Sequence, residues 1–278
     1  MKVIVGQVFD EERALYGQEN VTLERCKIDG PADGESALKE CENIVAKGCY
    51  FNLRYPLWHD VGVEIVGCEM TELCRAALWY SRDVKIDNCK LNGIKALREC
   101  ENITMQNCDV NSVEFGWFCK NLSLKDSAFV GEYFLLRSQD LRLENVSLKG
   151  KYSFQYVTDM VIERCNLDTK DAFWHAKNVV VKNSIVKGEY LGWYAENLTF
   201  ENCTIIGTQP LCYCKGLKLV NCKMIDCDLA FERSEVEADV CSHVVSIKNV
   251  TSGLVTVDSV GEVIADEPFA KGTVIIRL

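Results

Sequence analysis

Apolar and polar residues alternate in short segments that recur along most of the chain at intervals close to 19 residues. A typical segment has two apolar residues separated by one polar residue, such as Val84-Lys85-Ile86, and a further apolar residue five places later, at Leu91. Alternation with a period of two is typical of a half-buried β-strand and not of a helix. The hydrophobic pattern therefore predicts a repeated unit built from short strands.

A column of small residues sets the period of this repeat. Eight of the eleven aligned positions are cysteine, and the full set is Cys26, Cys49, Cys68, Cys89, Cys108, Ser127, Val146, Cys165, Ser184, Cys203 and Cys222. The first three gaps are 23, 19 and 21 residues, and the next seven are all 19. A period near 20 is typical of a solenoid, because a single repeat of this size cannot bury its apolar face alone.

Turn-forming residues occur at fixed places in each repeat. Asn, Asp or Gly stands six places before every aligned residue, as at Asn43, Gly62 and Asp83. These residues tolerate left-handed backbone angles and let the chain turn a corner. Leucine-rich repeats share the length but need a helical segment and their own Asn-Leu pattern, which this sequence lacks. We therefore predict an all-β fold, a single-stranded right-handed parallel β-helix with about 11 regular coils and irregular terminal coils.

The domain organisation follows from the same spacing. No Pro- or Ser-rich linker divides the chain, so we expect one β-helix domain over residues 1–278. Residues 1–18 precede the first complete repeat and are expected to form an N-terminal cap, and residues 19–235 the regular coils. The spacing breaks in residues 236–278, where strand-like segments at 243–250, 253–260, 262–265 and 273–277 predict irregular final coils and a cap.

Composition narrows the range of partners and compartments. Lys and Arg number 31 against 41 Asp and Glu, a net charge of −10, which argues against binding to nucleic acid or to an anionic membrane surface. No run of 18 apolar residues could span a membrane, and the N-terminus lacks the apolar core of a signal peptide. We therefore expect a cytoplasmic protein without nucleic-acid or membrane partners.

The 16 cysteines have two interpretations. Besides the eight aligned cysteines, four lie eight places earlier in their repeats: Cys41, Cys100, Cys119 and Cys214. Both columns are typical of small core residues, and many reduced thiols fit a cytosolic protein. The alternative is metal or redox chemistry, but Cys212-x-Cys214 is the only close pair and no His–Cys cluster accompanies it. We therefore expect no metal and no cofactor.

Most aromatic residues share one part of the repeat, which we call the aromatic strip. All five tryptophans stand ten places before the aligned residue: Trp58, Trp79, Trp117, Trp174 and Trp193. The next position holds His59, Tyr80, Glu99, Phe118, Arg137, Tyr156, His175, Tyr194 and Tyr213 in the repeats from Cys68 to Cys222. The strip thus has a tryptophan column and a neighbouring tyrosine column, which Glu99 and Arg137 interrupt.

Two orientations of the strip are consistent with the sequence. Strict alternation would place Trp inside and Tyr or His outside. A bulge at the corner would instead place Trp outside and Leu57, Leu78, Leu97 and Phe173 inside. Arg98 and Gln155 share the tryptophan column, which favours the second orientation. Either orientation leaves aromatic rings on the surface.

The strip also has two functional interpretations. It could pack one corner of the coil or serve self-association into a homo-oligomer. Alternatively it could bind a carbohydrate or a protein partner, because rings stack on sugars while Arg, Asp and His bond hydroxyl groups. The candidate binding residues are Trp58, His59, Trp79, Tyr80, Trp117, Arg137, Tyr156, Trp174, His175, Trp193 and Tyr194. We predict a non-enzymatic binding or scaffold protein.

A carbohydrate-active lyase or glycoside hydrolase using the same strip is the alternative hypothesis. The weak catalytic candidates are His59, which precedes Asp60, and His175 with Asp171. A glycosidase needs two carboxyl groups at one of two defined separations, and the strip offers no convincing pair. The sequence therefore favours binding over catalysis.

Several sequence elements resemble a known group of proteins. The recurring phrase Glu-Asn-[Val/Ile/Leu]-x-[Leu/Ile/Phe]-x-Asn-Cys is similar to pectin-lyase-like right-handed β-helix repeats. The segments 34–40, 55–59 and 192–194 (GESALKE, YPLWH and GWY) resemble an uncharacterised bacterial family, a domain of unknown function with a β-helix fold. The resemblance covers nearly the whole chain. It implies the fold and a prokaryotic cytoplasmic setting, and no activity.

Overall fold

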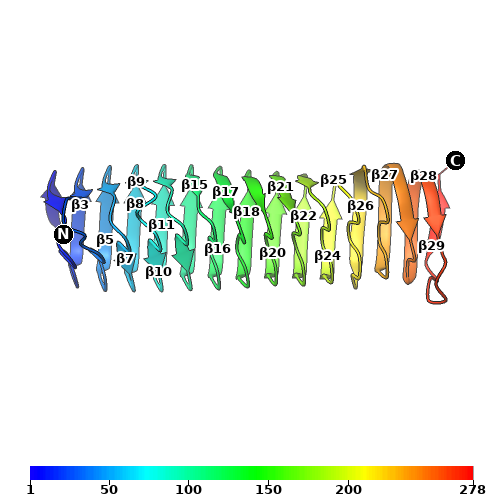
Figure 1. The fold of residues 1–278 in the computed structure, drawn as a ribbon, viewed down its shortest axis with the longest axis horizontal. Helices are drawn as coiled ribbons and strands as arrows, with labels where there is room; N and C mark the ends of the chain where they lie inside the picture. Colours follow the sequence, from blue (N-terminus) through cyan, green and yellow to red (C-terminus); the bar gives the residue numbers. More distant parts are fainter. Residues whose placement is uncertain (278) are drawn as a thin grey trace. The chain divides into compact units, whose positions relative to one another are not determined.

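The computed structural model describes residues 1–277, and within them the chain is a solenoid of parallel β-strands with about 14 turns and no helix. Its contacts divide the chain into two compact units, Met1–Leu141 and Arg142–Leu278. Within each unit successive coils follow one another in chain order (Figure 1). The predicted parallel β-helix is therefore confirmed.

The first unit is built from short strands, two or three to a coil. They are β1 (Lys2–Val5), β2 (Val8–Phe9), β3 (Glu19–Glu24), β4 (Lys27–Ile28), β5 (Glu42–Lys47), β6 (Tyr50–Phe51), β7 (Leu57–Trp58), β8 (Val61–Val66), β9 (Glu69–Met70), β10 (Leu78–Trp79), β11 (Arg82–Asp87), β12 (Lys90–Leu91), β13 (Leu97–Arg98), β14 (Glu101–Gln106), β15 (Asp109–Asn111), β16 (Lys120–Lys125) and β17 (Ala128–Glu132). The following strand, β18 (Gln139–Glu144), contains the boundary between the units.

The second unit repeats this plan and ends in longer strands. They are β19 (Ser147–Lys151), β20 (Thr158–Glu163), β21 (Asn166–Lys170), β22 (Lys177–Lys182), β23 (Ile185–Lys187), β24 (Glu196–Glu201), β25 (Thr204–Ile206), β26 (Leu217–Ile225), β27 (Glu235–Lys248), β28 (Ser252–Ile264) and β29 (Thr273–Ile276). Strands β26, β27 and β28 each take the place of two shorter strands of the earlier coils. The corner that separates those two strands is therefore missing from these coils.

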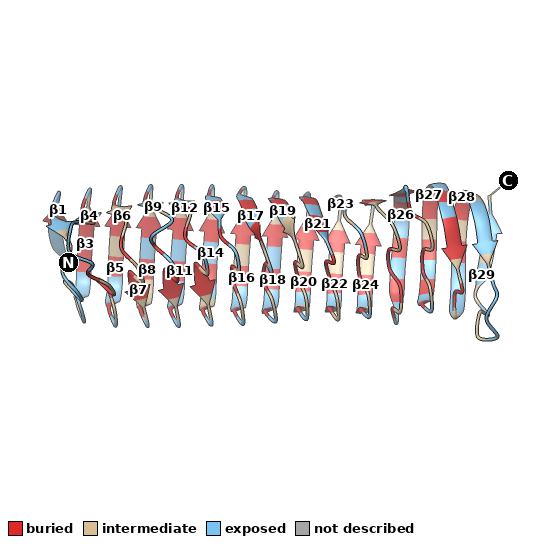
Figure 2. Ribbon diagram, viewed as in Figure 1, coloured by how far each residue is buried: buried red, intermediate tan, exposed pale blue. Residues whose placement is uncertain are grey.

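Strand register brings equivalent residues of successive repeats into line. Strand β11 pairs with β14 so that Val84 lies beside Ile103 and Ile86 beside Met105. All four side chains are buried, because alternate residues of each strand point into the coil. Figure 2 shows buried and exposed residues alternating along such strands. The predicted core columns are therefore confirmed.

The number of coils exceeds the eleven regular ones that the spacing predicts. Strand β1 pairs with β3 and β2 with β4, so residues 1–18 contain a coil of their own. Strands β27, β28 and β29 add further coils after the regular spacing has ended. The count of eleven covers only the regular repeats, and the pairing of β26 with β27 shifts register, so the terminal coils depart from the regular spacing. The prediction of a single domain stays a prediction.

The cysteines line the core, as the first interpretation of the sequence proposed. Fifteen of the 16 are buried, and Cys241 is half-buried. Thiols and backbone bond one another between coils: the N–H of Cys49 donates to the sulfur of Cys68 at 3.2 Å, and Cys68 donates to the carbonyl of Ala46 at 3.4 Å. A cysteine thus fills a small space and satisfies a backbone group that turns inward at the corner.

Candidate functional site

The tryptophan column faces outward. Trp79 is half-buried, while Leu78 before it is fully buried. The next residue, Tyr80, has a positive φ of 59° and is also exposed. Because the left-handed conformation interrupts the alternation of the strand, two consecutive residues face the solvent. The structure therefore adopts the second of the two orientations that the sequence allowed.

Each tryptophan ring is fixed by its own polar group. The indole N–H donates to a backbone carbonyl of the next coil, thirteen places before the aligned residue of that coil. The five bonds are Trp58 to Ala76 at 2.6 Å, Trp79 to Lys95 at 2.7 Å, Trp117 to Tyr133 at 2.7 Å, Trp174 to Tyr190 at 2.7 Å and Trp193 to Gln209 at 2.8 Å. Gln155 replaces a tryptophan and bonds Asp171 in the same way, at 3.2 Å. The tryptophan column therefore stabilises the corner, and its N–H groups are already used.

The rings of the first unit stack from coil to coil. Trp58 and Trp79 have ring centroids 5.2 Å apart and an interplanar angle of 3°. His59 and Tyr80 stack in the neighbouring column at 4.8 Å and 17°. Stacking at the spacing of one coil covers ring faces and leaves ring edges toward the solvent. We call such a run of rings a ladder.

Charged side chains interrupt this ladder in the coil that follows Tyr80. Arg98 takes the tryptophan position, and its guanidinium carbon lies 5.1 Å from the Trp79 ring and 5.7 Å from the Trp117 ring. Its position between two indoles is a cation–π arrangement. Glu99 takes the tyrosine position, and its Oε1 lies 3.5 Å from Nε of Arg98.

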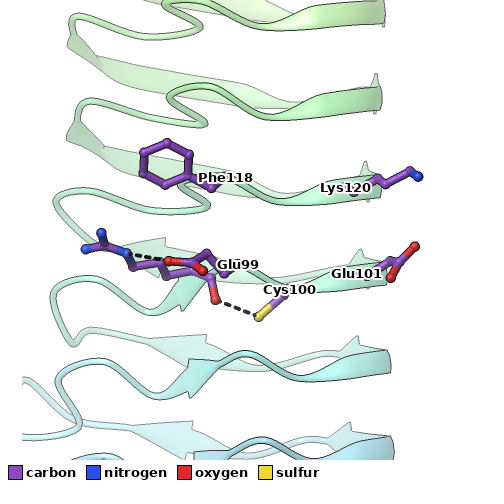
Figure 3. A pocket seen from close by; sticks show the side chains of 6 residues that line it. Glu99, Cys100, Glu101, Phe118 and Lys120 are labelled. Carbon is purple, nitrogen blue, oxygen red and sulfur yellow. Dashed lines mark hydrogen bonds and ion pairs between the residues drawn. The ribbon is translucent and has the colours of Figure 1, made fainter.

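An open hollow of about 480 Å³ lies at this interruption. Figure 3 shows its lining, with the Phe118 ring on the coil next to Glu99. Glu101 and Lys120 project from the far end of the lining, away from Phe118. Cys100 is buried and donates to the carbonyl of Arg98 at 3.3 Å, so its thiol belongs to the core.

The second unit carries a longer ladder in the tyrosine column. Tyr156 stacks on His175 at 4.8 Å, His175 on Tyr194 at 5.0 Å, and Tyr194 on Tyr213 at 4.8 Å, with interplanar angles of 8° to 14°. Beside this column Trp174 stacks on Trp193 at 5.4 Å. Tyr156 and Tyr194 are 42% and 43% exposed, so the ladder presents its edges outward.

The predicted binding residues therefore lie in two sets. Trp58, His59, Trp79, Tyr80, Trp117 and Arg137 belong to the first unit, and Tyr156, Trp174, His175, Trp193 and Tyr194 belong to the second. The predicted list omits Arg98, Glu99 and Phe118, which line the hollow, and Tyr213, which extends the second ladder. The sequence contained a signal for each of them. Phe118 and Tyr213 are aromatic residues of the tyrosine column, and Arg98 and Glu99 are charged residues at positions that are aromatic in other repeats.

The predicted acid–base groups do not come together. His59 is exposed, whereas Asp60 is fully buried on the inner side of the coil. His175 lies between two tyrosine rings, and no hydrogen bond joins it to Asp171 among residues 1–277. Burial raises the pKa of the Asp171 carboxyl above its ordinary value. Glu114 of the first unit, at the equivalent position of its own repeat, forms an ion pair with Lys95 at 3.3 Å.

The described part of the chain offers neither a metal-binding cluster nor a membrane-spanning helix. Residues 1–277 contain no group of three or more His, Cys, Asp or Glu side chains placed to hold a metal ion. The same residues contain no helix long and apolar enough to cross a membrane. The candidate binding sites of the strip are therefore the two ladders and the hollow.

Solved structures similar to this chain have low sequence identity to it. The catalytic domain of an α-1,3-glucanase in complex with tetrasaccharides is 11% identical, covers 99% of this chain and 64% of its own, and has a TM-score of 0.38. An alginate lyase in complex with a trisaccharide is 11% identical over 100% of this chain and 80% of its own, with a TM-score of 0.37. The tailspike protein of E. coli bacteriophage HK620 in complex with a pentasaccharide is 10% identical over 95% and 63%, with a TM-score of 0.39. The chain thus spans less than two thirds of the glucanase and tailspike chains.

Sequence comparison gives a family and no activity. No curated protein matches the chain in sequence. Residues 2–276 match a family described as "Protein of unknown function (DUF3737)", as the resemblance to a β-helical domain of unknown function led us to expect. Because the match covers nearly the whole chain, the protein belongs to the DUF3737 family.

Proposed function

We propose that the protein is a non-enzymatic binding protein that holds a carbohydrate along the ladder of its second unit. The observation that carries the proposal is the stack of Tyr156, His175, Tyr194 and Tyr213, four rings at the spacing of one coil with their edges toward the solvent. Such a stack offers a regular row of polar groups on a rigid support.

The ring edges, and not the ring faces, are the binding groups. Each inner ring of the ladder has both faces covered by its neighbours at 4.8 to 5.0 Å, which excludes a sugar from those faces. The hydroxyl groups of Tyr194 and Tyr213 and the ring nitrogens of His175 form no hydrogen bond within residues 1–277. A phenol both donates and accepts, and a neutral imidazole does the same at its two nitrogens, so the row matches sugar hydroxyl groups.

The spacing favours a chain of sugars over a single sugar. Neighbouring rings are separated by one coil, and successive residues of an extended glycan advance by a similar distance. Stacking also restricts the rotation of each ring before a ligand arrives, which lowers the entropy cost of binding. A glycan that runs along the coils would therefore contact about one aromatic ring edge for each of its sugar residues.

The carboxyl groups beside the ladder support binding without cleavage. Glu196 forms an ion pair with Lys177 at 3.2 Å, and Glu232 forms one with Lys248 at 3.1 Å. A glycosidase places two carboxyl groups on either side of the bond that it breaks. Carboxylates that are paired with lysines are better suited to holding side chains in place at the edge of a binding surface than to catalysing cleavage.

A glycan array followed by titration tests the proposal. Trp193 lies 5.4 Å from the Tyr213 ring and 6.4 Å from the Tyr194 ring, so its fluorescence should report a ligand on the ladder. Tyr194→Phe keeps the stack and removes one hydroxyl group, and we expect a roughly 3- to 10-fold weaker Kd, the value of one net hydrogen bond. Tyr50→Phe removes a hydroxyl group from the first unit and serves as the matched control.

The control variant is expected to bind like the wild-type protein. No binding across the array would contradict the carbohydrate proposal as a whole. An equal Kd for Tyr194→Phe and the wild-type protein would show that any bound glycan lies away from the ladder edges.

A further inference from the structure

The interruption of the ladder in the first unit has the geometry of an empty place in a stack. The N–H of Tyr80 donates to the carbonyl of Arg98 at 3.0 Å, and the N–H of Glu99 donates to the carbonyl of Trp117 at 2.9 Å. These bonds place Tyr80, Glu99 and Phe118 at the same position of three successive coils. Two of these positions carry rings, and the one between them carries a carboxylate.

The width of this place corresponds to one ring. His59 and Tyr80, one coil apart, stack with centroids 4.8 Å from each other. Tyr80 and Phe118 are two coils apart, so their rings are separated by about 9.6 Å, twice the spacing of neighbouring strands. Two van der Waals contacts of about 3.5–4.0 Å each account for most of that distance. A single planar ring inserted between them would restore the period of the ladder.

The flanking rings are partly exposed, and a hollow adjoins this place on the side of Glu99 and Phe118, with Tyr80 outside its lining. Tyr80 is 37% exposed and Phe118 is 43% exposed. The hollow of about 480 Å³ opens over Glu99 and against the ring of Phe118 (Figure 3). That volume is within the usual range for a small-molecule site.

The charges beside the gap favour a neutral ligand. The Glu99 carboxylate and the Arg98 guanidinium lie 3.5 Å apart, so their charges cancel for a ligand placed next to both. The Arg98 guanidinium contacts the rings of Trp79 and Trp117, and its central carbon also lies 5.7 Å from the Phe118 ring, so Arg98 borders the gap on the side of the tryptophan column. The Glu99 side chain is 44% exposed, which leaves its carboxylate able to accept a hydrogen bond from a ligand.

We infer that the gap between Tyr80 and Phe118 is a binding site for a neutral planar heteroaromatic ring that carries an N–H donor. The ring stacks between the two side chains and donates its N–H to the Glu99 carboxylate. The neighbouring column provides the precedent, because the planar Arg98 guanidinium fills an equivalent position between Trp79 and Trp117. The site lies in the first unit and is independent of carbohydrate binding by the second.

Indole and benzofuran are the probes, because they have nearly the same shape and differ in the N–H donor. Chemical shifts of the Tyr80 and Phe118 ring protons are followed by NMR as each probe is added to the full chain. We expect ring-current shifts at both residues, and indole binding roughly 3- to 10-fold tighter than benzofuran, the value of one net hydrogen bond. Glu99→Gln should reduce this preference, since the amide oxygen accepts a weaker hydrogen bond than a carboxylate.

Glu99→Tyr provides the sharpest variant, because its own ring should fill the gap and abolish binding of both probes. Glu101→Tyr adds the same side chain two residues away, at the end of the lining that points away from Phe118, and should bind indole like the wild-type protein. Thermal unfolding of both variants verifies that they fold. Should Glu99→Tyr fail to fold, the shifts of Tyr80 and Phe118 in the wild-type protein decide the question.

Three results would overturn the inference. They are the absence of binding by indole up to its solubility limit, shifts that map away from Tyr80 and Phe118, and undiminished binding in a folded Glu99→Tyr protein. Equal affinity for indole and benzofuran would overturn the role of Glu99 as an acceptor. A failure of the glycan array would leave this inference unaffected, because the two experiments use different units and different ligands.

Discussion

Asp60 makes the stability of the protein depend on pH in a way that one substitution can isolate. Its side chain is fully buried. Oδ1 accepts the N–H of Cys41 at 2.8 Å, whereas Oδ2 is buried and has no hydrogen-bond partner among the described residues. Burial of the charged form raises the pKa of the Asp60 carboxyl from 3.8 to about 8. The folded chain therefore holds a neutral carboxyl group at neutral pH.

The sign and size of the effect follow from proton linkage. Between about pH 4 and pH 8 the unfolded chain has lost the Asp60 proton and the folded chain retains it. The stabilisation is fully present below the unfolded pKa and is lost as the pH rises toward the folded pKa, at about 1.4 kcal/mol per pH unit. From pH 4 to pH 7 the Asp60 contribution therefore falls by about 4 kcal/mol.

Asp60→Ser removes this titration with little change to the corner. Ser81 occupies the same position one coil later, where its hydroxyl accepts the N–H of Asp60 at 3.2 Å and donates to the carbonyl of Leu57 at 3.5 Å. We expect a serine at position 60 to make equivalent bonds. Relative to the wild-type protein, the variant should therefore gain about 4 kcal/mol between pH 4 and pH 7.

Urea unfolding at pH 4, 5, 6, 7 and 8, followed by tryptophan fluorescence, measures this difference. The other carboxyl groups titrate in both proteins, so the difference between variant and wild type isolates Asp60. A difference that stays constant across this range would refute the argument. It would show that Asp60 ionises at its ordinary pKa, for example because the corner opens to admit water.

Three further predictions concern the core and the strip. In the native protein a thiol reagent should label Cys241 alone among the described cysteines, because the others are buried. Burial also raises the pKa of a thiol such as Cys74, to about 12, which lowers its reactivity. Rapid labelling of several thiols would contradict this prediction. Phe173→Ala should lower the free energy of unfolding in urea by about 3–5 kcal/mol, since the ring is fully buried and stacks on Phe154 at 5.0 Å. Trp79→Phe should lower the free energy of unfolding by about 1 kcal/mol in the same assay, because it loses the indole N–H bond and keeps an aromatic ring in the ladder. A loss as large as that of Phe173→Ala would show instead that the Trp79 ring packs the core.

The sequence was sufficient for the coil and its core because both depend on local alternation. Val84, Ile86 and Leu91 lie in three apolar columns, and each of them is buried as predicted. The columns persist because each side chain contacts its equivalents in the coils before and after. The terminal coils were harder to predict, since β27 and β28 run continuously through the corner and carry no turn residue at the expected place.

The direction of the aromatic side chains could not be predicted from alternation. It depends on a positive φ at residues such as Tyr80, His175 and Tyr194, with values of 55° to 61°. Glycine, asparagine and aspartate signal this conformation in a sequence, and aromatic residues do not. For the same reason the sequence did not reveal that His59 and Asp60 face opposite sides of the coil. His59 takes the left-handed conformation at the outer face, and the side chain of Asp60 then turns inward.

The same backbone conformation explains why the gap at Glu99 differs from the rest of the ladder. Left-handed angles at a residue with a side chain cost about 1–2 kcal/mol. Tyr80 recovers part of this cost by stacking on His59, as Tyr194 does on His175 and Tyr213. Glu99 has the same conformation, with φ of 50°, and has no ring to stack. A ligand ring placed there would gain contacts that the ladder provides for itself elsewhere, without any change in the backbone.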